Sequence, residues 1–157
     1  MYREEYDERQ LKIRGDVYRR GWVFAVGLML VNFYLNTFEG VVWAPPGSMF
    51  VLVSMASIAY VSIEMMVRDV FVGRDSWRLY VIPFCQLFFA FWLFFLSWPD
   101  RDYLVSGGML TRSGVSLVNA VFFFLVGIVG VGKFIVKRRL ETDEETTPAK
   151  AVDSKKR

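Results

Sequence analysis

Four uncharged, apolar runs constrain the fold of this chain more than any other feature of its sequence. They cover residues 21–38, 40–63, 79–99 and 113–132. Each run is roughly 18–24 residues long, and a helix of that length crosses a hydrocarbon core of about 30 Å. In lipid, the N–H and C=O groups of the backbone must hydrogen-bond within the protein, so spanning segments are helices or closed barrels. The runs lack the alternation of apolar and polar residues that is typical of barrel strands. The sequence therefore predicts an all-α fold, an integral membrane four-helix bundle with short loops.

Polar segments flank these runs and divide the chain into three parts. Residues 1–20 form a charged N-terminal segment, and residues 21–139 form the membrane domain. The last segment, 140–157, combines many charges with no apolar period, so we expect a disordered tail. The predicted spans are about 21–38, 49–67, 79–98 and 115–136.

The scarcity of reactive side chains excludes several function classes. The chain has no His and one Cys, Cys85, which lies in the third apolar run. An internal disulfide and a histidine-based catalytic site are therefore excluded, and the converging ligands that a zinc site needs are nearly absent. The glycines of GIVGVGKF are not followed by the Lys-Ser/Thr of a phosphate loop. We predict a protein that is not an enzyme and has no catalytic residues, cofactor or metal.

Basic residues predict the orientation of the chain. Of its 19 Lys and Arg, 17 fall in the N-terminal segment, the second loop and the C-terminal tail, and only Arg101 and Arg112 fall in the third loop. The positive-inside rule then places both termini in the cytoplasm, with the protein in the cell (inner, cytoplasmic) membrane. Four of the five Trp lie at predicted span boundaries, where indole rings favour the headgroup layer. The net charge of +3 accordingly indicates lipid, not nucleic acid, as the partner.

The charged segment DERQLKIRGD, residues 7–16, directly precedes the first apolar run. On a helix, Glu8 would pair with Lys12 and Asp16 with Arg20, each pair contributing about 0.2–0.5 kcal/mol. Ile13 and Val17 share a narrow apolar face with Tyr2, Tyr6 and Gln10, which would lie on the membrane or on the other helices. Two interpretations remain open. The segment orients the chain, or it presents a docking surface for a cytoplasmic partner formed by Asp7, Glu8, Arg9 and Gln10.

Two short motifs also resemble those of a known set of proteins. DERQ before the first span, and SIAYVSIEMMVRDVFVGRD at the close of the second, are similar to sequences of small bacterial four-span membrane proteins of unknown function. The resemblance covers about the first half of the chain. It implies a four-helix membrane fold and a bacterial source, and it carries no activity that could be transferred to residues here.

Polar residues within the apolar runs are the candidate functional positions. Each run has one small or polar stripe, as expected where helices pack in lipid. Glu64 is the only acid well inside a predicted span, and Arg68 lies one turn later, so the sequence predicts an ion pair between them. The alternative is a proton or cation site. The candidate packing or path residues are Asn32, Asn36, Ser54, Ser57, Glu64, Arg68, Gln86 and Asn119.

Two functions from different classes fit these features. The first is a non-enzymatic accessory or regulatory subunit that binds a membrane or cytoplasmic protein. The second is a small transporter or channel, which would require a homo-oligomer because four helices leave little room for a pore. The first is favoured, since most charge lies at the cytoplasmic side and no catalytic set is present.

Overall fold

Four helices and one short hairpin make up the protein. The computed structural model describes residues 8–71, 76–99 and 103–153, with backbone alone for 46, 76–80 and 140–153. The helices are α1 (Glu8–Thr37), α2 (Pro46–Val67), α3 (Ser76–Ser97) and α4 (Arg112–Asp153). Strands β1 (Val105–Ser106) and β2 (Met109–Leu110) pair in antiparallel fashion between α3 and α4. The all-α prediction is confirmed, and each helix contains or nearly coincides with one predicted span.

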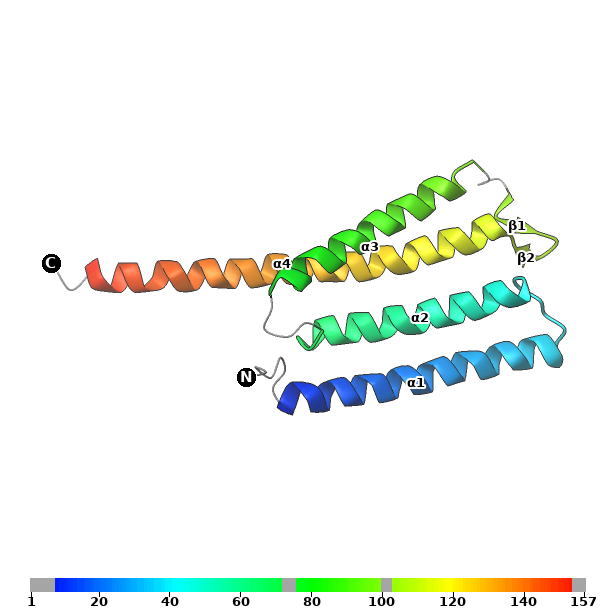
Figure 1. Ribbon diagram of the computed structural model, residues 1–157, viewed down its shortest axis with the longest axis horizontal. Helices are drawn as coiled ribbons and strands as arrows, with labels where there is room; N and C mark the ends of the chain where they lie inside the picture. The colour runs from blue at the N-terminus through cyan, green and yellow to red at the C-terminus, as the bar shows by residue number, and fades with distance from the viewer. Residues whose placement is uncertain (1–7, 72–75, 100–102, 154–157) are drawn as a thin grey trace, which may run out of the picture.

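The helices lie side by side in an open row in the order α1, α2, α4, α3 (Figure 1). The most extensive packing joins α3 to α4, while α1 packs mainly against α2. Both ends of the described chain lie at the same end of the row (Figure 1). The arrangement differs from a bundle in which four helices share one core, because α1 and α3 each have one main neighbour.

Local sequence explains where the helices begin and end. Pro46 opens α2, at a position where its missing N–H costs no hydrogen bond. Asp69 closes the same helix with a φ of 57°, and the N–H groups of Asp69 and Val70 donate to the carbonyls of Met66 and Met65. This is a Schellman motif, and the contact of Val70 with Met65 supplies its usual apolar component.

The hairpin end, which we define as residues 38–45 and 103–111, has its own turn chemistry. Gly107 and Gly108 both have positive φ, as a two-residue type I′ turn requires. Thr111 directly precedes α4 and caps it, because its hydroxyl accepts a hydrogen bond from the N–H of Gly114 in the first turn. The N–H of Leu110 donates to the carbonyl of Trp43 at 2.8 Å, so the hairpin is joined to the α1–α2 loop.

Glycines set how closely the helices approach. A Cβ on Gly130 of α4 would lie 2.7 Å from Cβ of Pro83 in α3, and one on Gly127 would lie 2.7 Å from Leu87. A Cβ on Gly21 of α1 would likewise clash with the side chain of Val61 in α2. The predicted small-residue stripe of the fourth run therefore faces α3 at Gly127 and Gly130, where backbone and side chains meet without an intervening Cβ.

Two features of the helices bear on the predicted spans and tail. Among the residues whose side chains the structure describes, two helices contain stretches long and apolar enough to cross a membrane, Gly47–Val67 and Arg112–Arg139, and Val81–Ser97 of α3 is a shorter apolar stretch. In α1 the charged segment and the first run share one helix, and Asn32 and Asn36 lower its apolar character. The backbone of 140–153 is helical and not irregular, because extending a formed helix avoids the cost of nucleation.

Candidate functional site

A cluster of five charged residues joins three helices at one end of the row. This charge cluster consists of Arg20 of α1, Glu64 of α2, Arg68 and Asp69 directly after α2, and Lys133 of α4. It lies at the end where α2 closes, opposite the hairpin end (Figure 1).

Glu64 is held between two guanidinium groups. Its Oε1 lies 2.9 Å from Nε of Arg68 in a hydrogen-bonded pair, as the sequence predicts. Nη2 of Arg20 lies 2.5 Å from the same oxygen, at an angle that does not suit a hydrogen bond. The side chain of Glu64 is 15% exposed, whereas those of Arg20 and Arg68 are 39% and 46% exposed. The adjacent Glu64 carboxylate raises the pKa of the Arg20 guanidinium.

The pairing of Arg20 corrects a prediction. The i,i+4 spacing assigns Arg20 to Asp16, but Asp16 pairs with Arg19 at 3.4 Å and Arg20 turns toward α2. The reason is burial: Glu64 is mostly removed from solvent and has a larger need for a counter-charge than the half-exposed Asp16. An ion pair within a helix is worth little, so a tertiary contact easily replaces it.

Lys133 of α4 forms hydrogen bonds to the C-terminal end of α2. Its Nζ donates to the carbonyl of Val67 and to both carboxylate oxygens of Asp69, all at 3.0 Å. The carbonyl of Val67 belongs to the last turn of α2, where carbonyls lack helical partners. A cation at this position also complements the negative end of the helix dipole. Lys133 therefore satisfies the helix end and the exposed Asp69 together.

The apolar face of the N-terminal segment packs against the same end of α2. Val17 is fully buried against Met65 and Val70, with Ile13 beside it. The sequence allows this face to lie either on the membrane or on the other helices. In the structure, Ile13 and Val17 lie against another helix, α2. Gln10 is half-buried, Glu8 and Arg9 are exposed, and Asp7 lies outside the described residues.

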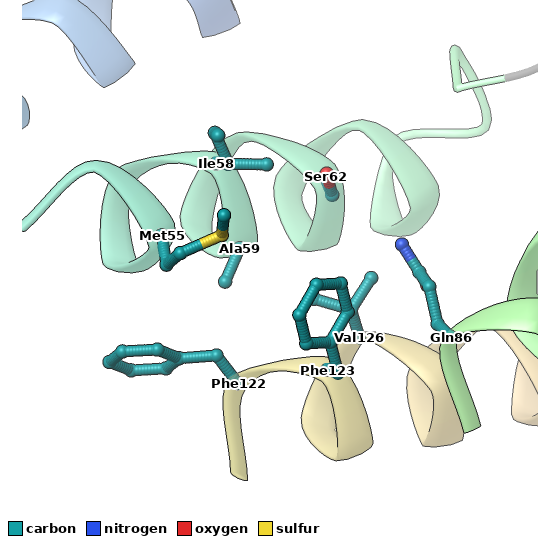
Figure 2. Close-up of a pocket in the computed structure, with 8 residues that line it drawn as sticks. All are labelled: Met55, Ile58, Ala59, Ser62, Gln86, Phe122, Phe123 and Val126. Carbon is teal, nitrogen blue, oxygen red and sulfur yellow. The ribbon is translucent and has the colours of Figure 1, made fainter. Parts of the chain in front are cut away.

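A small, mainly apolar cavity lies between α2, α3 and α4. Figure 2 shows Ser62 of α2 and Gln86 of α3 at its edge, with apolar side chains around the rest. Its volume is about 30 Å³, which suits a water molecule and is too small for an organic substrate. Oε1 of Gln86 and Oδ1 of Asn119 are buried without hydrogen-bond partners among the described residues.

The remaining candidate polar residues do not join one path. Oδ1 of Asn32 accepts a hydrogen bond from Nε1 of Trp43 at 2.8 Å near the hairpin end, and Asn36 is exposed. Ser57 is buried and donates to the carbonyl of Val53 on its own helix, and Ser54 is half-buried. The structure thus brings together Glu64 and Arg68, and it separates them from the polar groups of α1 near the hairpin.

Comparison with known proteins adds no assignment to this geometry. Within the described part of the chain, no three Cys, Asp or Glu side chains lie close enough together to hold a metal ion. No protein-family model, curated protein or solved structure matches the sequence closely enough to indicate a relationship, so a function must be argued from the residues themselves.

Proposed function

We propose that the chain is a four-span protein of the cytoplasmic membrane that acts as a non-enzymatic accessory or regulatory subunit. The observation that carries the membrane part is the exposure of large apolar side chains along the helices. Trp22 of α1 is 72% exposed, and Phe91 and Phe95 of α3 are 70% and 67% exposed. Soluble monomers rarely expose apolar patches larger than a few hundred Å². A surrounding of lipid would cover these faces on both edges of the row.

The distribution of charge supports the orientation. The exposed cations Arg19, Lys137, Arg138 and Arg139 lie toward the end of the row that holds the charge cluster. The hairpin end, residues 38–45 and 103–111, contains no cation, and the first residue of α4 beside it is Arg112. Such asymmetry favours a cytoplasmic position for the charged end and an outer position for the hairpin.

The interaction role rests on the exposed start of α1. Glu8 and Arg9 project into solvent on a helix that Val17 and Arg20 fasten to α2, so the docking surface stands on a rigid support. A helix held in this way can bind a partner without the entropic cost of ordering a free segment. The proposed partner is a cytoplasmic or membrane protein.

One set of single-cysteine variants tests both parts of the proposal. In a Cys85→Ala background, a cysteine at Ser106 should react with an impermeant thiol reagent on intact cells, and one at Glu8 should react only after permeabilisation. A photoreactive side chain at Arg9 should then crosslink to one cytoplasmic protein, and the same group at Arg112 should not. Labelling of Glu8→Cys on intact cells contradicts the orientation, and equal crosslinking at both sites contradicts the docking surface.

The unpartnered oxygens of Gln86 and Asn119 support a second candidate, a small transporter or channel formed by a homo-oligomer. Oε2 of Glu64 is likewise buried without a hydrogen-bond partner. Against this candidate, Glu64 has two guanidinium partners and the cavity at Gln86 is the size of a water. We therefore favour the accessory subunit, and reconstituted vesicles distinguish the two.

A further inference from the structure

An apolar groove of about 280 Å³ crosses the face of α2 between α1 and α4, toward the hairpin end. Leu28 and Leu35 of α1 form one wall, and Val118 and Phe122 of α4 form the other, while Val53 and Ala56 of α2 form part of the floor. The two walls make no extensive contact with each other, which leaves the groove open between them.

The groove offers little polar surface to a ligand. Asn32 and Trp43 are the polar side chains in its lining, and they are hydrogen-bonded to each other at 2.8 Å. Cavities with apolar walls stay dry and bind apolar molecules. A sugar, nucleotide or peptide would lose its hydrogen bonds to water on entering and gain few in return. The occupant must therefore be apolar where it touches the groove.

The groove is a space of about 280 Å³ between two helices that both pack on α2, and it suits a slender occupant. A narrow, flexible chain of methylene groups fits such a space.

A single cation stands near the same groove. Arg112 is exposed at the first position of α4, two residues after Leu110, which lines the groove. Within the described residues 38–45 and 103–112 it is the one cation, and the acid Glu39 there accepts a hydrogen bond from the hydroxyl of Tyr34. A guanidinium beside an apolar groove complements a ligand with a phosphate at one end and a hydrocarbon chain at the other.

We propose that this groove binds one acyl chain of an outer-leaflet phospholipid, whose phosphate interacts with Arg112. This inference rests on the proposed membrane location. The bound lipid fills the space between α1 and α4 that the row of helices leaves open, so it acts as a structural ligand of α1.

Quenching of Trp43 by phospholipids with brominated acyl chains tests the proposal. The protein retains Trp43 alone, with the other four Trp replaced by Phe, and is reconstituted in vesicles with increasing fractions of brominated phospholipid. Quenching should saturate at a low fraction of brominated lipid, as expected for one bound chain. Arg112→Gln should weaken the apparent affinity about fivefold.

Two filling variants and one matched control separate the groove from the general lipid contact. Ala56→Phe fills the groove from α2 and Val31→Phe fills it from the α1 side, so both should abolish the saturating quenching. Val51→Phe adds the same ring to an exposed position of α2 outside the groove and should leave it unchanged. Loss in all three variants, or in none, overturns the proposal.

A second protein, which retains Trp22 alone, distinguishes an incorrect groove proposal from an incorrect membrane location. Trp22 is highly exposed and lies outside the groove, so its quenching should rise in proportion to the bulk fraction of brominated lipid. Proportional quenching at both Trp22 and Trp43 overturns the groove and leaves the membrane location standing. No quenching at either position overturns both.

Discussion

Replacement of Gly130 by Ala tests the close contact between α3 and α4 most directly. The new Cβ would lie 2.7 Å from Cβ of Pro83, well inside the ordinary carbon–carbon contact of about 3.5–4.0 Å. The ring of Pro83 is rigid and cannot rotate away. The two helices must therefore separate locally by about 1 Å. Overpacking of this kind costs about 1–3 kcal/mol.

The helix propensity of Ala offsets part of this cost. Gly to Ala within a helix gains about 0.8–1.0 kcal/mol, so the net destabilisation by Gly130→Ala is about 0–2 kcal/mol. Gly132→Ala is the matched control, because it lies on the same helix and its Cβ would meet nothing within 4 Å. It gains the propensity alone. The difference between the two variants isolates the packing cost, about 1–3 kcal/mol, or roughly 5- to 150-fold in the unfolding equilibrium.

The assay is unfolding in mixed micelles with an increasing mole fraction of a denaturing detergent, followed by circular dichroism. Gly127→Ala should fall between the other two, since its Cβ would meet the flexible side chain of Leu87, which can move in part. Equal midpoints for Gly130→Ala and Gly132→Ala would refute the close α3–α4 contact. A larger loss for Gly132→Ala than for Gly130→Ala would refute the orientation of α4.

Two further predictions concern Glu64. Glu64→Gln leaves Arg20 and Arg68 side by side without an acid, so it should destabilise the protein more than Glu64→Gln combined with Arg20→Met. A double-mutant cycle should give an Arg20–Glu64 interaction energy above about 1 kcal/mol, against about 0.5 kcal/mol or less for the exposed Asp16–Arg19 pair. Equal interaction energies for the two pairs would contradict the buried pair. In reconstituted vesicles, the unmodified protein should show no proton or cation flux above empty liposomes; a flux that Glu64→Gln abolishes while folding is retained would favour the transporter.

The sequence predicts helices well here because each apolar run is long and uninterrupted. The Glu64–Arg68 pair and the stripe at Gly127 and Gly130 also follow from helical spacing, which is a local property. The turn at Gly107 and Gly108 carried a signal, two adjacent glycines between short segments, that indicates a type I′ hairpin. The strands themselves cannot be predicted, because two-residue strands lack any detectable alternation.

The contacts that spacing could not reveal are those between distant helices. Arg20 and Glu64 are far apart in the chain, and local rules assign Arg20 to Asp16 instead. The contact of Lys133 with Asp69 depends on which helices lie side by side, and the four apolar runs in the sequence do not reveal this spatial order. The row α1, α2, α4, α3 places the fourth helix beside the second, which is what brings Lys133 to the end of α2.

The register of α1 against α2 follows from two polar contacts. Arg20 meets Glu64 at one end, and Asn32 meets Trp43, just before α2, at the other. Twelve residues separate Arg20 from Asn32, or about 18 Å along the helix. Between them lie the close approach of Gly21 to Val61 and the ring contact of Phe24 with Tyr60, with centroids 5.0 Å apart. A shift of α1 by one turn would break both polar contacts together. The ion pair of Arg20, at the end of the charged N-terminal segment, therefore helps to fix the position of the apolar half of the same helix against α2.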